Sequence, residues 1–245
     1  MFVIYSDRVM RTLICIPTYN EADNIAPLID AINAQGAGFD LLVIDDASPD
    51  GTGRIVAECM AQHDNLTMLE RKEKGGLASA YIAGFKFGLE KGYDYVGEMD
   101  ADFSHSPEAL QEVQTLLDTG HYQFLIGSRY TAGGGTKNWG SIRRLISRFG
   151  SLYARSILRV PIADMTGGFN FWSADCLRAI NLDQIVSEGY VFQIELKTRA
   201  HRAGMAFREF PIIFEDRRVG QSKMTRSIIF EAFYKVIRLR FAIKR

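Results

Sequence analysis

One stretch near the start of the chain reads Leu13-Ile14-Cys15-Ile16-Pro17-Thr18-Tyr19-Asn20, four apolar residues followed by a polar turn. A second stretch, Leu41-Leu42-Val43-Ile44-Asp45-Asp46, has the same form. Short apolar runs that end in turn residues are typical of strands buried on both faces of a sheet. Helix-like segments follow at about 23–35 and 52–62. This alternation predicts an α/β fold with a mostly parallel sheet.

The same alternation continues to the middle of the chain. Further apolar runs lie at 66–69, 95–99 and 124–127, with helix-like segments at 76–89 and from Ser106-Pro107-Glu108 onward. Right-handed crossovers place the carboxyl ends of parallel strands at one edge of the sheet, where ligands of such folds bind. We therefore expect the polar clusters 17–21, 45–50 and 100–102 to meet at that edge.

The pattern changes after Tyr130. Residues 131–136 are predicted to form a flexible glycine loop, 142–158 a helix with four arginines, 192–202 a helix and 206–214 a late strand. The four arginines are Arg143, Arg144, Arg148 and Arg155. No internal repeat or low-complexity linker divides the sequence. We therefore expect one domain over 1–245.

Composition narrows the class of protein. The 29 basic and 29 acidic residues balance, which argues against general nucleic-acid binding. Three widely spaced cysteines in apolar segments indicate buried, reduced thiols and a reducing, cytosolic setting. We see no signal peptide, and no apolar run approaches the roughly 20 residues that span a bilayer. The expectation is a soluble or peripheral protein.

Asp100 and Asp102 follow directly on the apolar run 95–99. Two carboxylates so placed can converge on one cation, and hard oxygen ligands suit Mg²⁺ or Mn²⁺ bound to nucleotide phosphates. The plainer alternative is that Asp102 caps the turn or the next helix. Because two other polar clusters are expected at the same edge, we favour the metal site. We expect His105 to order the loop.

The loop 45–52 also follows a predicted strand. Asp45 or Asp46 can accept hydrogen bonds from the ribose or base of a nucleotide. We expect Asp50 and Thr52 to be mainly structural, as a turn and a helix cap. The segment 17–21 can place an aromatic ring and a carboxylate beside a base, although this signal is weak alone.

Basic residues lie where anions are expected. Arg129 comes just past the fifth predicted strand, and Arg143 and Ser147 share one helix face at a spacing of four residues. Arg217 and Lys223 lie in a late glycine-containing loop, beside Arg218. Arginine and lysine side chains bind phosphates, so at least one phosphate site is predicted. For any single one of them, solvated charge is the default alternative.

Taken together, these stretches resemble family 2 glycosyltransferases with the GT-A fold, and among them the polyprenol (dolichol) monophosphate mannosyltransferases. The matching stretches run in the expected order along nearly the whole chain: 17–21, 45–52, 99–105, 127–130, 164–169, 189–193 and 217–223. The resemblance implies a Rossmann-like GT-A domain with a nucleotide-binding half over about 11–130 and an acceptor-binding half over about 131–225.

The resemblance also implies roles for individual residues. The expected nucleotide contacts are Pro17, Tyr19, Glu21, Asp46 and Asp100. The expected metal ligands are Asp100 and Asp102, with Ser104 standing where relatives can have a glutamine ligand. The residues expected around the donor diphosphate and the lipid phosphate are Arg129, Arg143, Ser147, Arg217 and Lys223. Asp100, Asp102 and Arg129 are the implied catalytic residues.

The implied activity is metal-dependent, inverting transfer of mannose from GDP-mannose to a polyprenyl or dolichyl phosphate, with Mg²⁺ or Mn²⁺ as cofactor. Two alternatives stay open: a polyprenyl-phosphate glycosyltransferase that uses a UDP-sugar such as UDP-glucose, and a non-catalytic nucleotide-sugar-binding subunit. Many relatives have C-terminal transmembrane helices. Their absence here implies a cytoplasmic, peripheral protein that reaches lipid through the membrane surface or a small membrane-anchoring partner.

The segment of about 226–245 bears on that contact. Its basic residues are Arg226, Lys235, Arg238, Arg240, Lys244 and Arg245, against the single acidic Glu231. Its apolar residues at helical spacing are Ile229, Phe233, Val236, Ile237 and Phe241. Such a helix can lie on an anionic membrane. We favour this membrane role, or a role in binding a partner, over the alternative that the helix packs on the core with a solvated basic face.

Overall fold

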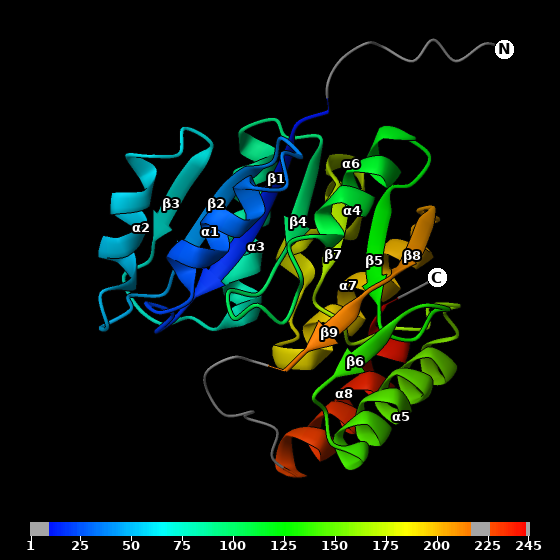
Figure 1. Ribbon diagram of the computed structural model, residues 1–245. Helices are drawn as coiled ribbons and strands as arrows, with labels where there is room; N and C mark the ends of the chain where they lie inside the picture. The colour runs from blue at the N-terminus through cyan, green and yellow to red at the C-terminus, as the bar shows by residue number, and fades with distance from the viewer. Residues whose placement is uncertain (1–9, 217–225, 244–245) are drawn as a thin grey trace, which may run out of the picture.

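The computed structural model describes residues 10–216 and 226–243, with side chains over 10–216 and 233–243. Within these ranges seven strands form one sheet in the order β3-β2-β1-β4-β7-β5-β8 (Figure 1). They are β1 (Thr12–Thr18), β2 (Asp40–Asp45), β3 (Leu66–Glu70), β4 (Tyr95–Glu98), β5 (Phe124–Ser128), β7 (Asn170–Ser173) and β8 (Phe207–Pro211). All neighbours pair in parallel except β7, which is antiparallel to β4 and β5. The predicted α/β fold with a mostly parallel sheet is confirmed.

Helices cover both faces of the sheet. One face packs against α1 (Ile25–Asn33), α2 (Thr52–Met60) and α4 (Ala109–Asp118). The other packs against α3 (Leu77–Glu90), α6 (Ala174–Ile180) and α7 (Gly189–Arg202), and α5 (Ser141–Leu158) and α8 (Arg226–Ala242) extend that layer. Strand β1 contributes to both hydrophobic cores, because its side chains alternate between the two faces of the sheet. Leu13 and Cys15 lie in one core, and Ile14 and Ile16 lie in the other.

The loops at the carboxyl ends of the strands meet as predicted. The Asp46 N–H donates to the Thr18 carbonyl at 3.0 Å, and the Met99 N–H donates to the Cys15 carbonyl at 3.1 Å. The Asn20 N–H donates to the Ser48 hydroxyl at 3.1 Å. These bonds hold the loops after β1, β2 and β4 together at one edge of the sheet.

The second half of the chain differs from the prediction in several details. Strand β7 was not predicted, although it lies buried between β4 and β5. The segment 206–214 is divided into β8 and β9 (Ile213–Glu215), because the chain leaves the main sheet after Pro211. Part of the predicted loop 131–136 is strand β6 (Gly135–Lys137), which pairs with β9 in a second sheet. A short 3₁₀ helix also lies at Leu182–Gln184.

Helix α8 packs on the core over its described part. Val236 and Leu239, and Ile243 just after the helix, are buried in the core that α5 and α7 share, while Ile237 and Phe241 stay exposed. The Tyr153 hydroxyl donates to the Phe233 carbonyl at 3.1 Å. This outcome fits the core-packing alternative for the C-terminal helix, and the Ile229 side chain lies outside the described ranges.

Two further features of the fold concern the cysteines and the length of the apolar helices. The three cysteines are free and buried, as predicted: Cys15, Cys59 and Cys176. Over the ranges that the structure describes, no helix is both long enough and apolar enough to cross a membrane.

Candidate active site

The acidic segment after β4 forms a tight, buried turn. Asp102 is buried, and its Oδ1 accepts a hydrogen bond from the Ser104 N–H at 3.0 Å and another from the Ser104 hydroxyl. Phe103 between them has a φ of +61°, a left-handed conformation that is uncommon outside glycine and occurs in tight turns. Ser104 therefore holds the Asp102 carboxylate in place.

Asp100 is positioned from two sides. Its N–H donates to His105 Nδ1 at 3.1 Å, and the Tyr81 hydroxyl donates to its Oδ1 at 3.4 Å. The His105 ring is buried against Phe169 and Phe214. Burial lowers the pKa of His105, which agrees with an unprotonated Nδ1 that accepts the bond. His105 orders the loop, as predicted.

The two aspartates after β2 have different surroundings. Asp45 accepts hydrogen bonds from the Thr18 hydroxyl at 2.8 Å and from the Ser48 N–H and hydroxyl at 2.9 and 2.6 Å. Asp46 accepts from the Gly75 and Gly76 N–H groups, both at 3.1 Å. Its Oδ1 also lies 2.8 Å from Arg71 Nη1, an ion pair without hydrogen-bond geometry. Asp45 thus closes its own loop, and Asp46 joins its loop to the turn before α3.

The remaining residues of these loops lie nearby. Asp50 accepts from the Thr52 N–H and hydroxyl at 3.0 and 2.6 Å, and the Glu21 N–H donates to the Thr52 hydroxyl at 3.0 Å. The predicted structural roles of Asp50 and Thr52 are confirmed. Tyr19 is partly exposed, with the Lys74 ammonium 3.4 Å from its ring centre.

A cavity of about 760 Å³ opens beside the acidic turn. Its lining brings together four of the predicted site residues: Asp100, Arg129, Arg143 and Ser147. The rest of the wall is mostly apolar and aromatic, from α5, α7, α8 and the segment 166–168. The cavity thus combines a carboxylate, two guanidinium groups and a hydroxyl with a wall suited to hydrocarbon. Asp46, Asp102 and Pro17 do not line it.

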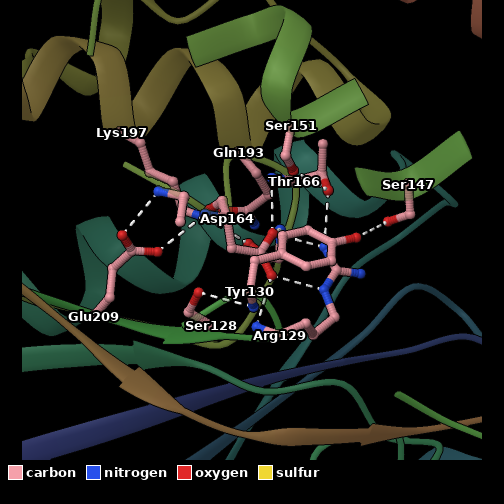
Figure 2. Close-up of polar contacts among 12 residues, drawn as sticks. Ser128, Arg129, Tyr130, Ser147, Ser151, Asp164, Thr166, Gln193, Lys197 and Glu209 are labelled. Atoms are coloured by element: carbon pink, nitrogen blue, oxygen red, sulfur yellow. Dashed lines mark hydrogen bonds and ion pairs between the residues drawn. The ribbon is translucent and has the colours of Figure 1, made fainter. Parts of the chain in front are cut away.

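Arg129 lines the cavity and belongs to a buried polar network (Figure 2). Its Nε and Nη2 each donate to the Asp164 carboxylate at 2.7 Å, and Nη2 also donates to the Thr166 hydroxyl at 2.8 Å. Burial would raise the pKa of Asp164, but the charge and hydrogen bonds of Arg129 lower it to about 2. The pair is ionised at neutral pH and fixes the segment 164–167 against the end of β5.

Lys197 of α7 supports the same segment from beneath. Its Nζ donates to the backbone carbonyls of Asp164 at 2.9 Å and Gly167 at 2.8 Å, and its side chain is fully buried. Burial lowers the pKa of Lys197 to about 8, against the opposing charges of Asp164 and Glu98. Glu209 accepts from the N–H groups of Ala163 and Asp164 at 2.8 and 3.0 Å. The cavity floor is therefore held on both sides of Asp164.

Gln193, one turn before Lys197, links the cavity to β4. It donates to Glu98 and accepts from the Asn170 side chain at 2.9 Å. Trp172 Nε1 also donates to Glu98, at 2.6 Å. Burial raises the pKa of Glu98 to about 7 despite these hydrogen bonds. Helix α7 thereby connects the strand that leads to Asp100 with the segment 164–168.

Arg143 and Ser147 occupy the wall formed by α5. Arg143 Nη1 donates to Asp216 at 2.7 Å, and its guanidinium lies 4.0 Å from the Trp139 ring centre. Ser147 accepts from the Tyr130 hydroxyl at 2.7 Å. Buried Arg143 Nε and Trp139 Nε1 have no hydrogen-bond partner among the described residues. Both N–H groups belong to residues that line the cavity, so they can serve a bound anion. Arg217 and Lys223, which were predicted to join them, lie outside the described residues.

The acidic residues match a nucleotide-bound cation better than a cage made of protein alone. No group of three or more His, Cys, Asp or Glu side chains gathers to hold a metal within 10–216 and 233–243. Mg²⁺ is usually bound by one or two carboxylates together with substrate phosphates and water. Asp100, which lines the cavity, and the neighbouring Asp102 are such a pair of hard oxygen donors.

Comparison with known proteins identifies the family. Residues 13–180, more than half of the chain, match the family described as glycosyl transferase family 2. The chain belongs to glycosyl transferase family 2. An undecaprenyl-phosphate mannosyltransferase of Micrococcus luteus is 44% identical over 94% of this chain and 93% of its own. A polyprenol monophosphomannose synthase of Mycolicibacterium smegmatis is 42% identical over 92% of this chain and 85% of its own.

Solved structures of more distant proteins share the fold of this family 2 glycosyltransferase. Glucosyl-3-phosphoglycerate synthase of Mycobacterium tuberculosis, solved with Mn²⁺ and UDP, has a TM-score of 0.64 at 19% identity. The match covers 96% of this chain and 81% of that one. A mannosyltransferase of Pyrobaculum calidifontis, solved with GDP-Man and Mn²⁺, has a TM-score of 0.57 at 16% identity, over 96% and 73% of the chains. These likenesses support the GT-A fold.

Sequence reasoning missed the partners that hold this glycosyltransferase site. Arg71, which pairs with Asp46, and Asp164, which pairs with Arg129, were given no role, and neither was Lys197. Gln193 and Lys197 did leave a signal, because they lie four residues apart on one face of a helix whose described residues are mostly buried. Asp164 lies in the stretch 164–169 that carries the family resemblance, but its pairing with Arg129 left no local signal, since the two residues are 35 apart in the sequence.

Proposed function

We propose that this glycosyltransferase transfers mannose from GDP-mannose to a polyprenyl phosphate, with inversion at the anomeric carbon. Near full-length similarity to two relatives named for mannosyl transfer onto polyprenyl phosphates gives the main support. The cavity adds to it, because an apolar wall with cationic groups suits a lipid that ends in phosphate.

The donor is proposed to bind at the edge formed by the loops after β1, β2 and β4. Pro17, Tyr19, Glu21 and Asp46 would contact the guanine nucleotide, with Asp100 at the boundary to the cavity. In the present arrangement Asp46 accepts from two backbone N–H groups and pairs with Arg71, so its carboxylate is already oriented. Such preorganisation lowers the entropy cost of binding.

Asp100 and Asp102 would hold Mg²⁺ or Mn²⁺ on the donor diphosphate. When bound, the cation supplies positive charge that stabilises the departing diphosphate. Ser104 is proposed to orient Asp102 rather than to act as a ligand, because its hydroxyl already donates to that carboxylate. His105 and Tyr81 position Asp100 from the other side.

The acceptor side needs binding groups but no general base, since a lipid phosphate is already ionised at neutral pH. Arg143, Ser147 and the unpartnered Trp139 N–H are proposed to bind this phosphate, together with Arg217 and Lys223 from the loop outside the described residues. Arg129 would add positive charge at the cavity floor while Asp164 fixes its position. Catalysis then rests on positioning and charge stabilisation.

Access to the lipid substrate is proposed to occur at a membrane surface, from the cytoplasmic side, directly or through a small membrane-anchoring partner. Contact with a membrane follows from the proposed substrate, because a polyprenyl chain resides in the bilayer. The exposed apolar residues around the cavity give further support.

The Asp102→Ala variant tests whether the acidic pair acts in catalysis. We expect mannosyl transfer from GDP-mannose to fall by at least about 100-fold, because a group that stabilises charge in the transition state is lost. Asp175→Ala is the matched control, since Asp175 is exposed on α6 and far from the acidic turn in sequence. Near wild-type transfer by Asp102→Ala would contradict the metal assignment. Wild-type protein that binds GDP and metal but never transfers mannose would instead be a non-catalytic subunit.

A further inference from the structure

Ser147 of α5 uses its hydroxyl differently from two threonines that lie inside other helices. A serine or threonine within a helix often donates to the carbonyl four residues earlier. Thr115 and Thr198 do so, at 2.9 and 2.7 Å. Ser147 instead accepts a hydrogen bond from the Tyr130 hydroxyl at 2.7 Å (Figure 2). Within the part of the chain that the structure describes, Ser147 donates its own proton to no other residue.

Tyr130 is held at the end of β5. Its backbone N–H donates to the Ser128 hydroxyl at 3.3 Å. The N–H of the preceding residue, Arg129, donates to the Asp164 carboxylate at 3.0 Å. The Arg129 guanidinium also lies 5.2 Å from the centre of the Tyr130 ring. The phenol therefore reaches α5 from a fixed point on the main sheet.

The Tyr130 phenol is the donor in this bond. Burial raises the pKa of Tyr130, although the positive charge of Arg129 opposes the rise, so the phenol keeps its proton at neutral pH. A serine hydroxyl has one proton and two lone pairs. Because Tyr130 donates to one of the lone pairs, the proton of Ser147 must point away from Tyr130.

The cavity is where this proton can find an acceptor. Among the four serines of α5, a helix that is described over its whole length, only Ser147 lines the cavity. Arg143, which also lines it, lies one helical turn earlier on the same face. Ser151, one turn later, lies by the Arg129 network instead, with its hydroxyl 3.4 Å from that of Thr166 (Figure 2). Ser147 is thus the α5 hydroxyl that can donate to an anion beside Arg143.

We propose that Tyr130 is a positioning residue for the lipid phosphate: its hydroxyl holds the Ser147 oxygen so that the serine proton points to that phosphate. The inference rests on the proposed function, in which Ser147 binds the phosphate. Tyr130 keeps Ser147 from turning to the backbone carbonyl of Arg143, the usual acceptor for a serine within a helix. The phenol also polarises the serine hydroxyl, which makes Ser147 a stronger donor.

A double-mutant cycle on the binding of farnesyl phosphate, a short polyprenyl phosphate, tests the proposal. Calorimetry of the full chain in mild detergent gives the Kd for the wild type, Tyr130→Phe, Ser147→Ala and the double variant. Ser147→Ala should weaken binding about 10- to 100-fold, because a hydrogen bond to a charged group is lost. Tyr130→Phe should weaken it about two- to tenfold. In the Ser147→Ala background, Tyr130→Phe should change the Kd by less than about twofold, since the hydroxyl that it positions is already absent.

Farnesol, which has the same hydrocarbon but no phosphate, is the control ligand. Neither single variant should change the Kd for farnesol by more than about twofold. Tyr95→Phe is the matched control variant, because the Tyr95 hydroxyl donates to the Tyr122 carbonyl at 2.8 Å and Tyr95 does not line the cavity. Tyr95→Phe should bind both ligands like the wild type. If Tyr130 only supported the shape of the cavity, Tyr130→Phe would weaken farnesol binding as much as farnesyl phosphate binding.

Three results would overturn the proposal. The first is wild-type affinity of Tyr130→Phe for farnesyl phosphate. The second is an equal loss from Tyr130→Phe in the wild-type and Ser147→Ala backgrounds, which would mean that the two hydroxyls act independently. The third is a wild-type protein that binds farnesyl phosphate no more tightly than farnesol, or a Ser147→Ala variant that binds it like the wild type.

Mannosyl transfer to farnesyl phosphate separates this proposal from the proposed function. Tyr130→Phe should raise the KM for farnesyl phosphate by about the factor found for its Kd and leave the KM for GDP-mannose unchanged. Wild-type protein that shows the coupled binding but transfers no mannose would contradict the proposed function and leave the role of Tyr130 standing. Mannose transfer by the wild type together with independent effects of the two variants would have the opposite meaning.

Discussion

Asp164 has the largest concentration of buried polar contacts near the site. Its carboxylate accepts from Arg129 through two side-chain nitrogens and the backbone N–H, and from the Gly167 N–H at 2.9 Å. Removing one partner of a buried ion pair leaves the other charge without compensation. The carboxylate thus stabilises both the fold and the position of Arg129 at the cavity floor.

The Asp164→Asn variant should lower the free energy of unfolding at neutral pH by about 3–5 kcal/mol. The folded pKa of Asp164 is about 2 and the unfolded one about 3.9, so its stabilisation is present above pH ~4. It is lost as the pH falls from about 4 to 2, and amounts to about 2–3 kcal/mol. Urea unfolding at pH 7, 4 and 3 measures both effects. Asp175→Asn, at an exposed position, should change neither the free energy of unfolding nor its pH dependence. If Asp164→Asn were as stable as the wild type, the stabilising role assigned to Asp164 would be wrong.

At the scale of elements, α8 shows how tertiary packing decides the meaning of a pattern. Its apolar residues at helical spacing fitted both a membrane helix and a core helix. In the structure Val236 and Leu239 are buried against the layer of α5 and α7, while Phe241 points to solvent. The adjacent α5 is the reverse case. Its apolar residues Ile142, Leu145, Phe149 and Leu152 recur at helical spacing like a core face, but their side chains are exposed.

Leu239→Ala tests this account of α8. We expect the free energy of unfolding to fall by about 2–5 kcal/mol, because a buried leucine leaves a cavity. Ile237→Ala on the same helix removes a half-exposed side chain and should cost much less. Thermal or urea unfolding followed by circular dichroism gives the comparison. Equal, small effects at both positions would mean that α8 does not pack on the core.

At the scale of the whole molecule, sequence patterns predicted the first half well and the second half less well. The runs at Leu13 and Leu41 became β1 and β2 because local apolar patterning is enough to define a buried parallel strand. The antiparallel strand β7 was not predicted, because it pairs with residues more than 40 positions away in the sequence, such as Phe124 with Trp172. Asp100 and Asp102 were predicted as metal ligands from their place after a strand, and both lie just after β4 in the structure. Arg129 was placed correctly, but its partner Asp164 depends on a long-range fold contact.

The most direct test of the central claim is a donor panel with purified protein, a short polyprenyl phosphate and Mg²⁺ or Mn²⁺. GDP-mannose, UDP-glucose and UDP-N-acetylglucosamine are supplied separately, and the lipid product is identified by mass spectrometry. The account predicts polyprenyl-phosphate mannose from GDP-mannose, no comparable product from either UDP-sugar, and none without the lipid phosphate. A lipid product formed mainly from UDP-glucose, or sugar transfer that does not need the lipid phosphate, would contradict it.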